Sequence, residues 1–133
     1  MDLLFFMRSL LLIAHGSRRE ASNDEVRELT KQLRNYAAKK GDGSKPLFEY
    51  VDCAFLELAP PSIPEGIHMC VSKGATEITV LPYFLSAGRH VSEDIPAEVD
   101  SVREKYPDVE IKITDYLGSS AGICELLLSL TIK

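Results

Sequence analysis

Short apolar segments alternate with amphipathic segments along this chain of 133 residues. The apolar segments have the length and composition of buried strands and span residues 9–14, 48–56, 77–84 and 109–114. The amphipathic segments have helical periodicity and span residues 23–40, 63–73, 94–105 and 121–130. Because a helix that joins two strands of one sheet brings them parallel, this order predicts an α/β fold with a parallel sheet and helices on both faces.

The first strand is expected near the centre of the sheet. Right-handed crossovers favour a doubly wound, four-stranded sheet with the strand order 2-1-3-4. The chain then leaves the first and third strands in opposite directions, which opens a crevice at their carboxyl ends. The length suits a single domain over residues 1–133. Met7 offers an alternative start, so residues 1–7 are a candidate N-terminal extension.

Capping signals mark the ends of the first two expected helices. Ser22 and Glu25 have the spacing of a capping box at the start of the first helix. Ser62 is the expected N-cap of the second helix, whose first turn accommodates Pro64. Gly74 is expected to end that helix, because glycine readily adopts the left-handed conformation found after helix ends.

The charge balance narrows the partners that the chain is expected to bind. It has 15 Lys and Arg against 20 Asp and Glu, a formal net charge of −5. Since neutralisation of phosphates supplies most non-specific affinity for nucleic acids, we expect no nucleic-acid partner. Asp2 and Arg8 interrupt the apolar N-terminal stretch, which falls short of the about 20 residues that span a bilayer, so we expect no membrane association.

The three cysteines, Cys53, Cys70 and Cys124, have no CxxC spacing. Their odd number and separation argue against a disulfide framework and against a thiolate zinc site. Each lies among apolar residues, so we expect buried, structural thiols. This pattern favours a reducing compartment, and we expect the protein to be cytoplasmic.

Two of the three histidines follow the strands that flank the expected crevice. His15 follows the first strand, with Arg18 nearby, and His90 follows the third strand, directly after Gly88 and Arg89. Neutral imidazole binds divalent transition metals, and a pair leaves coordination positions open for exchange. We therefore predict a metal site formed by His15 and His90. The structural alternative is that each histidine makes only hydrogen bonds within its own loop.

Glu57 follows the second strand, which lies beside the first in the expected order. Its apolar neighbours suggest a partly desolvated carboxylate suited to accept protons, and a solvated strand-end carboxylate is the alternative. We expect His68, inside the second helix, to be structural or at the surface. Glu93 and Asp94 are candidate functional acids, and the alternative is that they only stabilise the dipole at the start of the third helix.

Three motifs together resemble the small sirohydrochlorin chelatases, the single-domain class II chelatases of cobalamin and sirohaem biosynthesis. The first is His-Gly-Ser-Arg at residues 15–18. The second is Phe-Leu-Glu-Leu-Ala followed by Pro-Ser-Ile, within residues 55–63. The third is Leu-Pro-Tyr-Phe-Leu-Ser-Ala-Gly-Arg-His followed by Glu-Asp-Ile-Pro, within residues 81–96. The resemblance covers nearly the whole chain in the family's order.

The resemblance implies ATP-independent insertion of Co²⁺ or Fe²⁺ into sirohydrochlorin, with the metal as substrate and no tightly bound cofactor. His15 and His90 match the family's metal-binding histidines, and Glu57 matches a glutamate implicated in the same step. The substrate's carboxylates make Arg18 and Arg89 natural anchors, because arginine pairs with carboxylates bidentately. Further contacts are expected from backbone N–H groups at Ser86, Ala87 and Gly88.

Other functions stay open on sequence grounds. A metal chaperone or tetrapyrrole-binding protein on the same fold would bind its ligand without turnover. Phosphoryl transfer with His15 as nucleophile is disfavoured, because histidine phosphatases have an arginine where this chain has Ala14. Nickel insertion is disfavoured because the chain lacks the histidine-rich stretch of the nickel branch.

The resemblance also sets an expectation about assembly. Larger class II chelatases hold the tetrapyrrole between two fused α/β units, and this sequence supplies one. We therefore expect a homodimer whose clefts face each other across the interface. Phe84 and Leu85, which lie close to His90 in the sequence, are candidates to line it.

Overall fold

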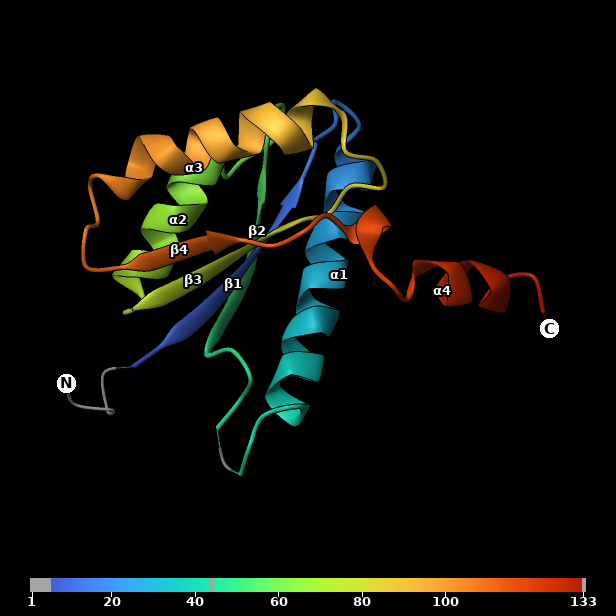
Figure 1. Cartoon of the computed structure of the whole chain (residues 1–133), viewed down its shortest axis with the longest axis horizontal. Helices are drawn as coiled ribbons and strands as arrows, with labels where there is room; N and C mark the ends of the chain where they lie inside the picture. Colours follow the sequence, from blue (N-terminus) through green and yellow to red (C-terminus); the bar gives the residue numbers. More distant parts are fainter. Residues whose placement is uncertain (1–5, 44, 133) are drawn as a thin grey trace.

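A computed structural model describes residues 6–43 and 45–132 of the chain as a parallel sheet with helices on both faces (Figure 1). The strands are β1 Arg8–Ala14, β2 Tyr50–Phe55, β3 Glu77–Pro82 and β4 Glu110–Ile113. They pair in parallel in the order β2-β1-β3-β4, which confirms the predicted topology. The central strand β1 is buried along nearly its whole length, as its continuous apolar character predicts.

The side chains of β1, β2 and β3 alternate between the two faces of the sheet, each of which has an apolar core. Towards α2 (Ile63–Ser72) and α3 (Ile95–Arg103), the larger core is formed by Leu11, Ile13, Ala54, Ile63, Ile67, Cys70, Ala75, Ile78, Val80, Ile95, Val99, Val102 and Ile111. On the opposite face, α1 (Glu20–Lys39) covers the alternate residues Leu10, Leu12, Ala14, Val51, Cys53 and Phe55. This period of two is what a sheet covered on both faces requires.

Helix α1 begins before the expected capping box. Its N-cap is Arg19, whose side chain makes no capping hydrogen bond. The N–H of Ser22 donates to the Arg19 carbonyl at 3.0 Å, so Ser22 already lies in the first turn. The predicted box at Ser22 and Glu25 is therefore wrong. The Asn23 side chain instead bonds the backbone of Ser17, which folds the preceding loop onto the helix.

The start of α2 confirms the predicted cap. Ser62 Oγ accepts from the Glu65 N–H at 3.2 Å, and the Ser62 N–H donates to Glu65 Oε1 at 2.8 Å. Hydrogen bonding to the Glu65 carboxylate from the Ser62 backbone N–H, and more weakly from the Ser62 side chain, lowers the pKa of Glu65. Gly74 follows the helix with φ of +100°, as the predicted end requires.

One turn of π-helix, His90–Asp94, precedes α3 and was not predicted. The Ile95 N–H donates to the His90 carbonyl across this turn. Pro96 follows without an N–H of its own, so it cannot support a tighter hydrogen-bonding pattern at this point. The expected helix at 94–105 therefore starts later as regular α-helix, at Ile95.

Helix α4 (Ile123–Ser129) extends away from the rest of the domain, beyond the 3₁₀ turn at Leu117–Ser119 (Figure 1). The sequence predicts the helix but not this placement. Ile111 and Ile113 of β4 face the larger core. The other side chains of β4 point to the α1 side of the sheet and are polar. That strip offers α4 little apolar surface. The large apolar side chains that stay exposed in this segment are Leu126, Leu127, Leu128, Leu130 and Ile132.

Two predictions concern the first residues of the chain, a candidate extension and the absence of a membrane span. Most of the candidate extension, residues 1–5, lies outside the described residues. Met7 itself is tied to the domain, because its N–H donates to Thr76 Oγ1 at 3.0 Å. Across residues 6–43 and 45–132, the structure contains no helix with the length and apolar character needed to cross a membrane.

The cysteines divide into two classes. Cys53 and Cys70 are buried, as expected, whereas Cys124 is exposed on α4, so its predicted burial is wrong. The prediction failed because apolar neighbours in sequence do not cover a helix that leaves the domain. Burial raises the pKa of Cys53 and raises the pKa of Cys70 to about 12.

These environments predict the thiol chemistry of a Cys124→Ser variant. Only the thiolate reacts with disulfide reagents, and burial suppresses it at Cys53 and Cys70. We expect no thiol to be titrated at pH 8 in the native variant and two per chain in urea. Rapid labelling of either thiol before unfolding would contradict the buried placement.

Candidate metal centre

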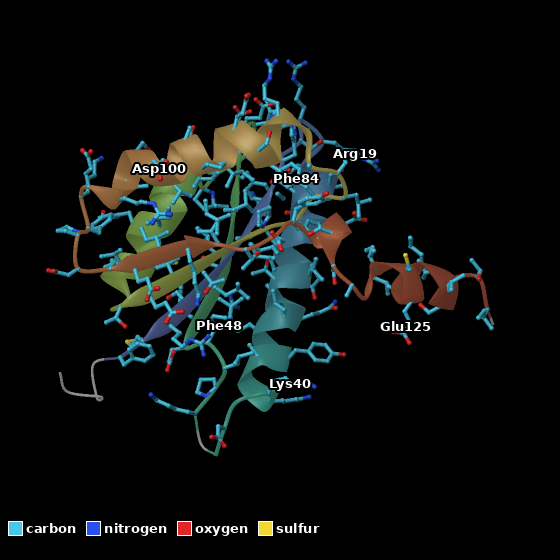
Figure 2. All side chains as sticks on the ribbon, viewed as in Figure 1. Arg19, Lys40, Phe48, Phe84, Asp100 and Glu125 are labelled. Atoms are coloured by element: carbon cyan, nitrogen blue, oxygen red, sulfur yellow. The ribbon has the colours of Figure 1, made fainter. Side chains whose placement is uncertain are left out.

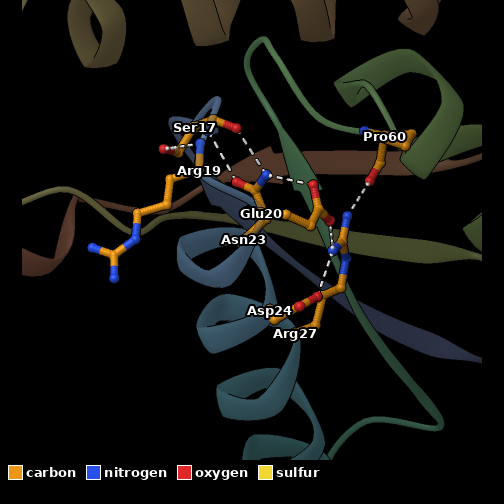
Figure 3. Close-up of polar contacts among 7 residues, drawn as sticks. All are labelled: Ser17, Arg19, Glu20, Asn23, Asp24, Arg27 and Pro60. Atoms are coloured by element: carbon orange, nitrogen blue, oxygen red, sulfur yellow. Dashed lines mark hydrogen bonds and ion pairs between the residues drawn. The ribbon is translucent and has the colours of Figure 1, made fainter.

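His15 follows β1 directly, in a loop held against the start of α1. Asn23 is 1% exposed, and its side chain accepts from the Ser17 N–H and donates to the Ser17 carbonyl, each at 2.9 Å. Figure 3 shows these bonds beside the Arg27 contacts described below. The loop after the strand is therefore fixed by a buried amide.

Glu57 is brought to His15 by sheet pairing that continues past the strand ends. The Leu56 N–H donates to the Ala14 carbonyl at 2.9 Å, and the Glu57 N–H donates to the His15 carbonyl at 3.1 Å. Gly16, with φ of +93°, packs directly on this segment. A Cβ at Gly16 would lie 1.7 Å from the Glu57 carbonyl oxygen, so only glycine permits this approach.

Arg27 ties the loop after β2 to α1 (Figure 3). Its guanidinium pairs with Glu20 and Asp24 and donates to the Pro60 carbonyl at 3.3 Å. The same group lies 5.3 Å from the centre of the Phe55 ring. The bond with Glu20 raises the pKa of Arg27, and it lowers the pKa of Glu20. Both groups therefore stay charged at neutral pH.

His90 comes to the site from the far side of β1. Its loop follows β3, whose pairing with β1 continues through a Tyr83 N–H to Ile13 carbonyl bond of 2.7 Å. Gly118 supports this loop, because its N–H donates to the Phe84 carbonyl at 3.0 Å. Figure 2 shows the labelled Phe84 at one end of the sheet and Phe48 at the other.

The two predicted metal ligands lie together. The ring centroids of His15 and His90 are 4.7 Å apart, and the Phe84 ring lies 6.4 Å from each. Both imidazole side chains are 43% exposed, so the site is open to solvent. Among residues 6–43 and 45–132, no group of three or more His, Cys, Asp or Glu side chains is arranged to hold a metal. The histidines thus form an open pair, not a closed cage.

The hydrogen bonds of His15 leave its Nε2 available. Its Nδ1 lies 2.9 Å from the Gly16 carbonyl oxygen, which can only accept, so the ring donates from Nδ1. Its Nε2 lies 3.5 Å from Glu57 Oε1, so in the neutral ring with the proton on Nδ1 the Nε2 lone pair faces the carboxylate. A metal ion bound to that lone pair would also be attracted by the carboxylate.

Glu57 differs from the expectation in one respect. Its side chain is 54% exposed, so the partly desolvated carboxylate inferred from its apolar neighbours is wrong. The reason is that Leu58 next to it has φ of +68° and is itself exposed, so the chain turns outward here. A pocket of 370 Å³ opens beside the glutamate and is lined by Leu56, Glu57, His90, Asp94, Ala97, Glu98 and Ser101.

The expected substrate-binding residues lie on exposed loops around the histidines. Arg18 is exposed after β1. The Arg89 side chain is 82% exposed, and its Nε lies 3.4 Å from Glu93 Oε2. Ser86, Ala87 and Gly88 are exposed before the π turn. None of these residues lines the pocket beside Glu57. His68 is exposed on α2 and bonds the Tyr106 hydroxyl, which confirms its predicted place outside the site.

The sequence interpretation missed two residues that shape the site, Asn23 and Arg27, and the contact that Asp94 makes. Asn23 and Arg27 carry no sequence signal that separates them from other polar residues of an amphipathic helix. Asp94 was assigned to the helix N-terminus, whereas its carboxylate lies 2.8 Å from His90 Nδ1. The spacing of four residues between histidine and aspartate is the signal that could have found it.

Comparisons with known proteins identify related sequences. Residues 9–132 match the sequence model of the CbiX family. A sirohydrochlorin ferrochelatase from Priestia megaterium is 32% identical over 92% of this chain and 43% of its own length. A sirohydrochlorin cobaltochelatase from Sulfurisphaera tokodaii is 30% identical over 91% of this chain and 88% of its own length. The chain spans only about two fifths of the first curated relatives.

Solved structures give the same result. The sirohydrochlorin chelatase SirB from Bacillus subtilis subspecies spizizenii, in complex with cobalt, has a TM-score of 0.81 and 25% identity. The match covers 95% of this chain and 50% of that one. SirB from Bacillus subtilis with Fe³⁺ has a TM-score of 0.77 and 27% identity, over 93% of this chain and 46% of that one.

The close contact at Gly16 predicts that alanine lowers the stability of the fold more at Gly16 than at Gly43. Gly16→Ala forces a Cβ into the Glu57 carbonyl, whereas Gly43, also at positive φ, has open space around it. We expect Gly43→Ala to lower the free energy of unfolding by about 1 kcal/mol from backbone strain alone. Gly16→Ala should cost at least about 2 kcal/mol more, measured by urea denaturation. Equal losses would show that the close approach is unimportant.

Proposed function

Because this chain belongs to the CbiX family, we propose that it is a sirohydrochlorin chelatase that inserts Co²⁺ or Fe²⁺ into the tetrapyrrole without ATP. The observation that carries the proposal is the His15–His90 pair, with ring centroids 4.7 Å apart and Glu57 beside it. The names of the relatives support the substrate, and the titles of the SirB structures support the metals. The metal is a substrate, and no tightly bound cofactor is proposed.

The proposed reaction needs a metal site that releases its ion. Metallation replaces two pyrrole N–H bonds with bonds to the metal, so two protons leave the macrocycle and the ion loses its bound water. Two imidazoles hold Co²⁺ or Fe²⁺ weakly and keep positions open for the incoming nitrogens. A closed site of four ligands would retain the ion.

Glu57 and His15 supply the proton acceptors in this proposal. Glu57 Oε1 lies 3.5 Å from His15 Nε2, and both groups are open to solvent. As the metal moves from His15 to the macrocycle, the imidazole and the Glu57 carboxylate each accept one of the two pyrrole protons that the metal replaces, and pass it to water. Arg18 and Arg89 lie on exposed loops and are the proposed partners of the substrate's carboxylates.

The second wall of the tetrapyrrole site comes, we propose, from a second copy of the chain. The 370 Å³ pocket is smaller than a tetrapyrrole with its carboxylate side chains. Leu85, beside the site, is 73% exposed, and Phe84 contacts both histidines. The exposed apolar residues of α4 add surface that a partner would cover. The free, buried thiols support our placement of the protein in the reducing cytoplasm.

Metallation assays test the roles of the histidines. With anaerobic sirohydrochlorin and Co²⁺ or Fe²⁺, the native protein should change the visible spectrum faster than the uncatalysed control. His15→Ala and His90→Ala should lower the rate by about 100-fold or more. Glu57→Gln should lower the rate while cobalt still binds, because glutamine keeps the shape but accepts no proton. His68→Ala is the matched control and should retain the full rate.

The outcomes separate the alternatives. Binding of cobalt without any acceleration would favour a metal chaperone or tetrapyrrole carrier. A full rate in either alanine variant at His15 or His90 would overturn the residue assignment while leaving the activity intact.

Sedimentation tests the assembly. We expect the active protein to sediment as a dimer, and Leu85→Asp to weaken the dimer and the metallation rate together, because the charge enters an apolar interface. Leu47→Asp, at an exposed apolar residue near the opposite end of the sheet, is the control. A fully active strict monomer would disprove the dimer.

A further inference from the structure

We propose that Asp94 is a positioning residue that holds His90 in the tautomer whose Nε2 binds the metal. This inference rests on the proposed function, because it assigns the metal to His90. Asp94 Oδ2 lies 2.8 Å from His90 Nδ1, within one helical turn. The carboxylate accepts and the ring donates, so the Nδ1 proton is fixed and the Nε2 lone pair is left free.

The backbone that carries this pair is anchored at both ends. The Ile95 N–H donates to the His90 carbonyl, and the Ile95 side chain is 0% exposed in the larger core. Within the turn, Ser92 Oγ donates to the carbonyl of Gly88, which precedes the turn, at 2.9 Å. A π turn is rare and is often found at functional sites. Here it places His90 and Asp94 so that their side chains meet.

A purely structural role would give Asp94 a different contact. Acidic residues at helix starts commonly cap the helix or stabilise its dipole. Asp94 lies in continuous helical backbone, with φ of −68° and ψ of −46°, so it is not at a free helix start, and its side chain makes no capping hydrogen bond. Its described partner is the imidazole of His90.

The carboxylate beside each histidine therefore lies at a different ring nitrogen. The Nδ1 of His15 bonds a backbone carbonyl, and a carboxylate, Glu57, faces its Nε2. His90 has its carboxylate behind the ring, on Nδ1, and its ring lies against that of His15. A carboxylate behind the ring orients an imidazole and strengthens it as a ligand. We assign the firmer hold on the metal to His90 and the exchange of metal for protons to His15 and Glu57.

Two measurements on Asp94→Asn and Asp94→Ala test the assignment without the tetrapyrrole. Nitrogen-15 NMR of the metal-free native protein should show His90 protonated at Nδ1 and not at Nε2. In both variants the two tautomers should mix. The dissociation constant for Co²⁺, measured by the visible absorption of the bound ion, should rise about 10-fold in Asp94→Asn and up to about 100-fold in Asp94→Ala.

Asp100→Asn is the matched control. It removes an exposed carboxylate of the same helix, which pairs with Arg103 at 3.0 Å, and should change neither measurement. A native His90 protonated at Nε2 would overturn the proposal, as would Asp94→Ala with unchanged tautomer and cobalt affinity. If the native protein binds cobalt and shows these effects but does not metallate sirohydrochlorin, the proposed function fails and the role of Asp94 stands.

Discussion

The hydrogen bonding of β1 to both of its neighbours determines the geometry of the candidate site. The ladder towards β2 continues through the carbonyls of Ala14 and His15, and the ladder towards β3 continues through the carbonyl of Ile13. Backbone pairing thus carries three loops to one edge of the sheet with little freedom. The side chains of His15, Glu57 and His90 inherit positions that the strands define. Sites at the carboxyl ends of parallel strands owe their reproducible geometry to this constraint.

The residues that stabilise the fold are different from the residues of the candidate metal site. The free energy of folding comes from the two apolar cores and the caps, whereas the candidate metal site is open to solvent and rich in polar contacts. The Asp94 carboxylate bonds the ring of His90, and the Gly16 carbonyl bonds the ring of His15, so these contacts orient the two imidazoles. An open site of this kind fits the proposed chelatase, which would have to release its metal.

Loops around the site are held by local contacts of several kinds. A buried asparagine holds the loop after β1, and an arginine on α1 holds the loop after β2. A π turn anchored by a buried isoleucine holds the third loop. Because each loop has its own anchor, the exposed loop ends can adapt while the two histidines stay in place, as the proposed chelatase would require. The apolar helix α4 stands apart from this arrangement and presents a separate surface.

The sequence by itself determined the α/β class, the strand order, the cap of α2 and the identity of the paired histidines. These follow from periodicity and from short-range rules, because strand alternation, capping boxes and crossover handedness depend on neighbouring residues. Only the tertiary structure decided that Glu57 is exposed, that Cys124 lies on a projecting helix and that Asp94 contacts His90. Exposure and side-chain pairing depend on what packs around a residue, and the contact of Gly16 with the Glu57 carbonyl joins segments about forty residues apart that no local pattern connects.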